Sequence, residues 1–149
     1  CHTLQLQSFA WEQYEAVVEL WQRAGLVLSR SDTREGLRRK LERDPELFLV
    51  ATNDDGQVVG AVMGSYDGRR GWVNHLAVDP ACQGQALGSR LMQELERRLM
   101  NVGCEKINLL IEPENSGVQS FYRQLGFAAC ELIFMEKWIA PPQDAKKGV

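Results

Sequence analysis

The amino-acid sequence predicts an α/β fold built on a mixed sheet. Two β-rich runs, 47–52 and 58–66, are separated by a segment whose Asp55 and Gly56 are typical of a tight hairpin turn. A leucine-rich run with helical periodicity, 87–102, stands between two apolar runs, which is the pattern of a strand–helix–strand crossover. A hairpin and a crossover together require strands of both directions.

The N-terminal third predicts an edge strand and two helices. Residues 3–7 alternate weakly between polar and apolar, as an edge strand does. Aromatic and apolar side chains then recur at helical spacing from Trp11 to Trp21 and stop before Gly25. Asp32 is placed to cap a short second helix. We expect this helix to bury its leucines and to leave its basic side chains in solvent, with Leu37 and Leu41 inside and Arg38, Arg39, Lys40 and Arg43 outside.

The middle of the chain predicts a third antiparallel strand. A turn over residues 67–71 leads from the hairpin into the β-rich run 72–78, so that three strands form a meander. The run must stop at Asp79 and Pro80, because proline cannot donate a ladder hydrogen bond.

The remaining elements follow from local signals. The leucine-rich helix ends before Gly103, and the short apolar run 107–111 is typical of a buried strand. Asn115 is placed to cap a last helix that ends before Gly126. We expect residues 127–138 to supply one or two closing strands of the sheet.

Length and composition limit the domain organisation and the partners. The 149 residues allow one domain, which we expect over residues 1–139, with a frayed tail over 140–149. The net charge of −3 argues against a nucleic-acid partner. No apolar run is long enough to span a bilayer, and the first residues lack a signal-peptide layout, so we expect no membrane partner and a cytoplasmic location. Cysteines and histidines lack metal-ligand spacing, and we expect no metal.

The segment that carries most chemical information joins the third meander strand to the leucine-rich helix. From Ala81 to Gly88 it has small residues and no charged side chain. Small residues let main-chain N–H groups converge, and the first turn of a helix adds unpaired donors, so the segment suits a phosphate or pyrophosphate. Close packing of the helix on the strand is the alternative use of small residues. The Gly-Lys-Ser/Thr of a P-loop and the G-x-G-x-x-G dinucleotide fingerprint are both absent.

Two motifs in this chain resemble those of the GNAT superfamily of N-acetyltransferases. The first resembles the loop that binds the acyl-CoA pyrophosphate, written Q/R-x-x-G-x-G/A, and comprises Val78, Pro80, Gln83, Gly84, Gln85, Ala86, Leu87 and Gly88. Ala86 stands where the family has its central Gly. The second resembles the later motif of the family and comprises Asn115, Phe121, Tyr122, Leu125, Gly126 and Phe127.

The resemblance implies a GNAT fold, with a mixed, mostly antiparallel sheet of six to seven strands flanked by about four helices. It implies acetyl-CoA as the co-substrate, with Asn115 on the pantetheine arm. The oxyanion would meet main-chain N–H groups of a strand that bulges away from its parallel neighbour. The implied acetyl-CoA-binding residues are Leu76, Ala77, Val78, Gln83, Gly84, Gln85, Ala86, Leu87, Gly88, Ser89, Asn115 and Tyr122.

The reaction that we expect is transfer of acetyl from acetyl-CoA directly to a primary amine in a ternary complex. Tyr122 is the candidate general acid, because a phenol near the thioester sulfur can protonate the leaving thiolate. The amine must lose a proton before it attacks, since an alkylamine has a pKa of about 10.4. His75 and Glu112 are candidate bases, and a water chain to solvent without a dedicated base is the arrangement that the sequence favours.

The acceptor is not identified by any motif. A small amine, a peptide N-terminus and a lysine all stay open, because residues 20–46, which select the acceptor in the family, carry no shared pattern. The chain is expected to be a monomer or a homodimer. The alternative function is a CoA-binding regulatory or structural module of the same fold without turnover.

Overall fold

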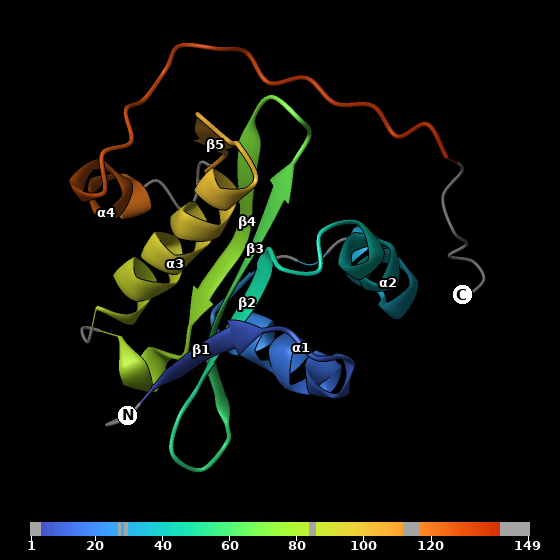
Figure 1. Ribbon diagram of the computed structural model, residues 1–149, viewed down its shortest axis with the longest axis vertical. Helices are drawn as coiled ribbons and strands as arrows, with labels where there is room; N and C mark the ends of the chain where they lie inside the picture. The colour runs from blue at the N-terminus through green and yellow to red at the C-terminus, as the bar shows by residue number, and fades with distance from the viewer. Residues whose placement is uncertain (1–3, 27, 29, 84–85, 112–116, 141–149) are drawn as a thin grey trace. The chain divides into compact units, whose positions relative to one another are not determined.

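The computed structural model describes residues 4–26, 28, 30–83, 86–111 and 117–140 (Figure 1). The chain divides into two units, Cys1–Leu110 and Ile111–Val149. The second unit carries the helix α4 (Gln119–Gln124). The first unit carries, in order, β1 (Gln5–Ser8), η1 (Trp11–Gln13), α1 (Tyr14–Arg23), η2 (Arg30–Asp32), α2 (Arg34–Arg43), β2 (Phe48–Thr52), β3 (Val58–Tyr66), β4 (Gly71–Val78), η3 (Pro80–Cys82), α3 (Leu87–Asn101) and β5 (Ile107–Leu109), where η denotes a 3₁₀ helix.

The sheet of the first unit confirms the predicted mixture of strand directions. Its strand order is β1-β2-β3-β4-β5; β1 to β4 are antiparallel neighbours, and β5 lies parallel to β4 after the crossover through α3. The hairpin between β2 and β3 closes where predicted, with Gly56 at φ 78° and the Asn53 N–H donating to the Gln57 carbonyl at 3.0 Å. Only a residue that tolerates positive φ fits that turn easily.

The expected closing strands are wrong for the described residues, and the sheet has five strands instead of six to seven. Residues 127–140 form no strand, and the side chains of Leu132, Ile133 and Met135 are almost fully exposed. An apolar, β-rich composition makes a strand favourable only where another strand meets its main-chain N–H and C=O groups. The composition of this segment alone therefore predicted more strands than the sheet has.

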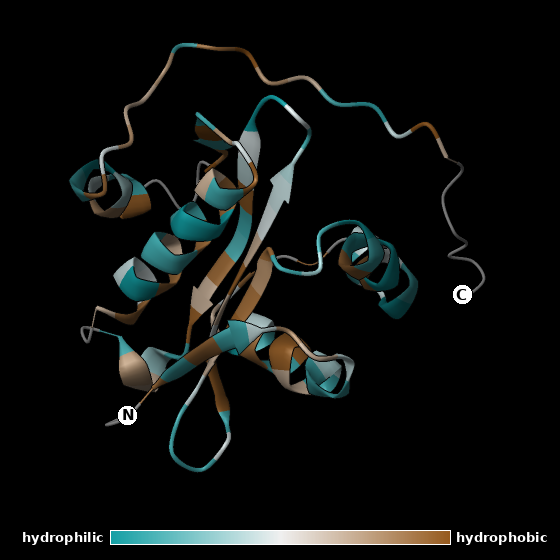
Figure 2. Ribbon diagram, viewed as in Figure 1, coloured by the Kyte–Doolittle hydropathy of each residue, from teal (hydrophilic) through white to brown (hydrophobic). Residues whose placement is uncertain are grey.

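Helices cover both faces of the sheet in the first unit (Figure 1). Helix α3 lies on one face and presents the leucine stripe that its periodicity predicts, while its polar side faces outward (Figure 2). Three glycines of the sheet let this helix approach closely, since a Cβ on Gly60 would meet Leu87 and Leu91, one on Gly64 would meet Leu95, and one on Gly71 would meet Leu99. The small residues on the strands thus determine how closely α3 packs on the sheet.

The opposite face carries α1 and α2 over an aromatic core. Trp21 of α1 is fully buried and stacks on Phe48 of β2 with ring centroids 6.3 Å apart, and Phe9 stacks on the same ring at 4.4 Å. Leu37 anchors α2 to this core. Helix α1 is therefore fixed beside β4, with Trp21 as its largest buried side chain.

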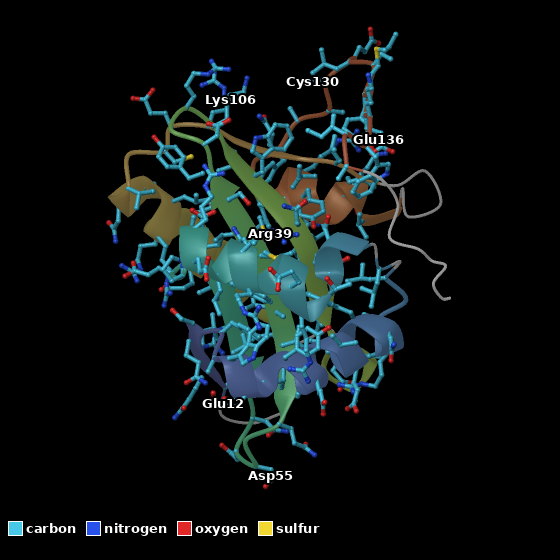
Figure 3. All side chains as sticks on the ribbon, turned by 90° about the vertical axis from the view of Figure 1, so that its right-hand side faces the viewer. Glu12, Arg39, Asp55, Lys106, Cys130 and Glu136 are labelled. Carbon is cyan, nitrogen blue, oxygen red and sulfur yellow. The ribbon has the colours of Figure 1, made fainter. Side chains whose placement is uncertain are left out.

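Helix α2 differs from the prediction at its N-cap and at one basic residue. Thr33, not Asp32, is the N-cap, and its Oγ1 accepts from the Gly36 N–H at 3.2 Å. Lys40 is turned inward, although Arg39 on the outer surface of α2 is exposed as expected (Figure 3). Helical periodicity places residues on faces, but the partners offered by the neighbouring strand decide which cation is buried.

Lys40 makes three contacts, two of which tie α2 to β3. Its ammonium donates to Asp44 at 3.0 Å, to the Ser65 hydroxyl at 3.0 Å and to the Gly64 carbonyl. Desolvation lowers the pKa of Lys40, and its hydrogen bond to Asp44 opposes that change. The charge of Lys40 is thus neutralised within the fold.

The close approach of α3 to β3 can be tested with a double-mutant cycle. A methyl group on Gly64 would lie 2.7 Å from Leu95 Cδ1, so Gly64→Ala should lower the free energy of unfolding by about 1–3 kcal/mol. Leu95→Ala should lower it by about 2–5 kcal/mol through the cavity that it leaves. Because the smaller residue makes room for the methyl group, the double variant should lose less than the sum, by about 0.5 kcal/mol or more, in urea unfolding. Additive losses would contradict this contact.

Candidate active site

Strand β4 contains a bulge at the point where predicted site residues begin. Ala61 pairs with Ala77 and Met63 pairs with Asn74, so two residues of β4, His75 and Leu76, stand opposite the single Val62. His75 has φ 54°, a conformation that costs a non-glycine residue about 1–3 kcal/mol and that is concentrated at functional sites. The bulge therefore indicates that β4 is part of the candidate functional site.

The bulge coincides with the separation of β4 from β5. The two strands pair only over residues 71–73 and 107–109. In the described part of the chain, residues 74–78 have no strand partner on that edge. The predicted acetyl-CoA-binding residues Leu76, Ala77 and Val78 lie there, so their main chain is available to an extended ligand.

The turn after β4 is shaped by Asp79. Its Oδ1 accepts from the Ala81 N–H at 2.9 Å and caps η3, while its Oδ2 accepts from Arg23 of α1 at 2.9 Å. Its own N–H donates to the Val59 carbonyl at 2.8 Å, which ties the turn to β3. The turn is thus fixed to three elements.

Helix α3 starts directly after this turn. Ala86 is its N-cap at φ 60° and ψ 20°, so an alanine here takes the left-handed conformation that a glycine takes at little cost. The first turn of α3 has no acidic residue, and its unpaired N–H groups form the positive end of the helix dipole. The structure places the predicted residues Gln83, Ala86, Leu87, Gly88 and Ser89 around this point, and Gly84 and Gln85 lie outside the described residues.

His75 forms a contact that the sequence did not predict. Its Nε2 lies 2.9 Å from Oδ1 of Asp32, which is 7% exposed. The ring also meets the edge of Trp21, with centroids 4.9 Å apart at an angle of 67°. Asp32, predicted as a helix cap, is therefore directed toward β4 instead, and no spacing rule connects two residues 43 positions apart.

An open pocket of about 300 Å³ lies beside this pair. Asp32 and Lys40 from the α2 side and Met63, Asn74 and His75 from the sheet are among its lining residues. Lys40 is paired with Asp44, and Asp32 contributes a carboxylate to the pocket lining beside His75.

Tyr122 belongs to the second unit. It lies on α4, half-buried between Phe121 and Phe127, whose ring centroids are 5.0 and 5.7 Å away. Desolvation raises the pKa of the Tyr122 phenol, so the neutral, proton-donating form is favoured. The other two predicted residues of this segment, Glu112 and Asn115, lie outside the described residues.

The comparison with protein families identifies the family of this chain. Residues 5–127 match the model of the Acetyltransferase (GNAT) family. The chain belongs to this family. It is 37% identical over 134 residues to an acetyltransferase of Pectobacterium atrosepticum, covering 90% of this chain and 94% of the relative. Acetyl transfer is therefore its general activity, and acetyl-CoA is the co-substrate of the family.

Solved structures of this family have the same fold. Ard1 from Thermoplasma volcanium superposes with a TM-score of 0.77 at 23% identity, covering 86% of this chain and 84% of that one. The PaiA N-acetyltransferase from Thermoplasma acidophilum, solved in complex with coenzyme A, gives a TM-score of 0.77 at 19% identity, with coverage of 88% and 93%. At these identities the likeness concerns the fold alone.

Neither a cluster of metal ligands nor a membrane-spanning helix occurs among the described residues. Within the ranges given above, histidine, cysteine and acidic side chains do not gather in groups of three or more that could hold a metal ion. No described helix is long and apolar enough to cross a membrane.

The left-handed Ala86 leads to a stability prediction. Ala86→Gly should raise the free energy of unfolding by about 1 kcal/mol, because glycine takes positive φ without the steric cost of a Cβ. Ala81→Gly is the matched control, since Ala81 is exposed in η3 and outside the left-handed region. Urea unfolding should show a gain for the first variant and none for the second. An equal loss in both would contradict the strain at Ala86.

Proposed function

We propose that this GNAT protein is an N-acetyltransferase that moves the acetyl group of acetyl-CoA to a primary amine by direct attack in a ternary complex. The observation that carries the proposal is the bulged β4, whose unpaired edge leads through a fixed turn into the N-terminus of α3. A strand edge suits the extended pantetheine arm, and a helix N-terminus suits the pyrophosphate. One continuous segment thus offers both kinds of donor.

The donor site is assigned to main-chain groups. Residues 76–78 would pair with pantetheine, and N–H groups between Gln83 and Ser89 would bind the pyrophosphate. The same strand would supply N–H groups to the oxyanion of the tetrahedral intermediate, where fixed dipoles contribute most. Asn115 is assigned to the pantetheine arm on the strength of its motif.

Tyr122 is assigned as the general acid. When the thioester breaks, the leaving thiolate needs a proton, and a phenol that stays protonated at neutral pH can give it. The raised pKa of Tyr122 supports this assignment, because an ionised phenolate would have no proton to donate.

The acceptor amine is assigned to the pocket beside His75. The pocket is open and has the Asp32 carboxylate in its lining, a group that suits an amine arriving as an ammonium ion. That amine must then be deprotonated. We assign this step to His75, because it lines the pocket; Glu112 lies outside the described residues, and a water chain to solvent is the alternative.

The proposed reaction can be tested with a panel of amines. Acetyl-CoA is incubated with the protein and a set of small amines, peptides with free N-termini and lysine derivatives, and free thiol is measured. At least one amine should accelerate thiol release over the protein-free rate, and mass spectrometry should show the acetylated amine. Binding of acetyl-CoA by calorimetry without thiol release across the panel would instead favour a CoA-binding module.

The role of Tyr122 leads to a second prediction. Tyr122→Phe should lower turnover by about 100-fold and leave the affinity for acetyl-CoA nearly unchanged, because it removes a proton donor and keeps the ring. Tyr66→Phe is the matched control, since its hydroxyl only donates to the Gly68 carbonyl in the turn between β3 and β4. An equal loss of affinity for acetyl-CoA would show that Tyr122 binds rather than catalyses.

A further inference from the structure

We propose that Asp32 is a positioning residue that holds the His75 imidazole as the proton acceptor for the attacking amine. The proposal rests on the proposed transferase function and assigns a role that no sequence motif gives. The carboxylate and the imidazole come from different layers, η2 and the β4 bulge, and meet at 2.9 Å with 6% and 23% of their side chains exposed.

Asp32 is fixed by its neighbours. The hydroxyl of Tyr14 donates to the Asp32 carbonyl at 3.4 Å, and Thr33 caps α2 immediately afterwards. Gly36 lets η2 lie against the first turn of α2, because a Cβ at this position would collide with the Ser31 carbonyl oxygen. The main chain that carries the Asp32 carboxylate is therefore held by its neighbours.

The bulge directs the ring of His75 to meet this carboxylate. The positive φ of His75 departs from regular strand geometry, and the ring packs edge-on against the buried Trp21. An imidazole held by a bulge, an aromatic edge and a carboxylate has little freedom to rotate. Such restraint is what a general base requires.

The contact also selects the nitrogen that can accept a proton. A carboxylate is only an acceptor, so Nε2 must carry the hydrogen and donate it to Asp32. The lone pair of a neutral imidazole is then on Nδ1, which has no hydrogen-bond partner among the residues described in this structure. Nδ1 is therefore the acceptor atom.

The surrounding charges favour the same assignment. Trp21 faces the ring from α1, while Met63 and Ser65 from β3, Asn74 from β4 and Lys40 from α2 line the adjoining pocket. Of these groups only Lys40 is charged, and its ammonium is paired with Asp44. Asp32 thus contributes the carboxylate that contacts the His75 ring.

The proton and electron balance of the step is complete. An ammonium acceptor first gives one proton to Nδ1 of His75. The lone pair of the neutral amine then forms the C–N bond, and the C–S bond breaks. His75 releases the first proton to solvent. The second amine proton also passes to solvent, which leaves the neutral amide. The thiolate takes its proton from Tyr122 or water. No oxidant, metal or further co-reactant is needed.

Nuclear magnetic resonance tests the contact without an acceptor. The chain has two histidines, His2 and His75, so the ring signals are simple to assign. We expect a downfield, slowly exchanging Nε2–H signal for His75 that is lost in Asp32→Asn. The matched control, Glu35→Gln, removes an exposed carboxylate from α2 and should leave this signal unchanged. A protonated Nδ1, or a signal unchanged in Asp32→Asn, would overturn the proposal.

Kinetics test the role of the contact. With the fastest amine of the panel, Asp32→Asn should lower kcat by about tenfold or more and change the KM for acetyl-CoA by less than about twofold. The ratio of the native kcat to the Asp32→Asn kcat should fall as the pH rises toward the pKa of the amine. More of the amine is then already neutral, so the reaction depends less on a base. If the kcat of Asp32→Asn is lowered by the same factor at every pH, or is not lowered at all, the role of Asp32 is overturned.

A conservative variant separates this role from a folding defect. Asp32→Glu keeps the carboxylate and should retain more turnover and more of the Nε2–H signal than Asp32→Asn. If both variants lose turnover equally while the signal is intact, the positioning role is refuted. Absence of thiol release by the native chain with every amine would refute the transferase function itself, whereas normal release by Asp32→Asn would refute only the proposal for Asp32.

Discussion

The extra residue in β4 is the constraint on which the site depends. Because His75 and Leu76 stand opposite the single Val62, β4 changes direction in the middle of the sheet and pairs with β5 only on one side of the bulge. A regular strand would continue the parallel ladder and occupy the main-chain groups of residues 74–78. The same irregularity therefore frees an edge for a ligand and sets the direction of the His75 ring.

The glycines under α3 complete this geometry from the other face of the sheet. Gly60, Gly64 and Gly71 let the helix lie close to β3 and β4, the strand that bulges. At its N-cap, α3 requires a left-handed conformation of Ala86, which is sterically unfavourable for alanine. Strain at His75 and at Ala86 stands at the two ends of one short segment, and both positions are adjacent to main-chain groups assigned to acetyl-CoA.

The sequence predicted what local patterns determine. The leucine stripe of α3, the hairpin at Gly56 and the parallel crossover follow from periodicity and turn chemistry, and the structure has all three. Asp32 was predicted as a cap because an acidic residue before a helix usually is one. Its real partner lies in another layer, and only the register of β4 makes them meet. The closing strands were overpredicted for the same reason, since pairing depends on residues far away in the sequence.

The arrangement of charge around the pocket explains why an imidazole is useful beside Asp32. A carboxylate alone would stabilise the acceptor as an ammonium ion, and an ammonium has no lone pair with which to attack a thioester. In the proposed reaction, His75, 2.9 Å from Asp32, is the group that takes the proton from the amine. Lys40 does not compete for Asp32, because Asp44 and the β3 groups already satisfy it. The proposed reaction thus uses the same pocket to receive the amine and to take up its proton.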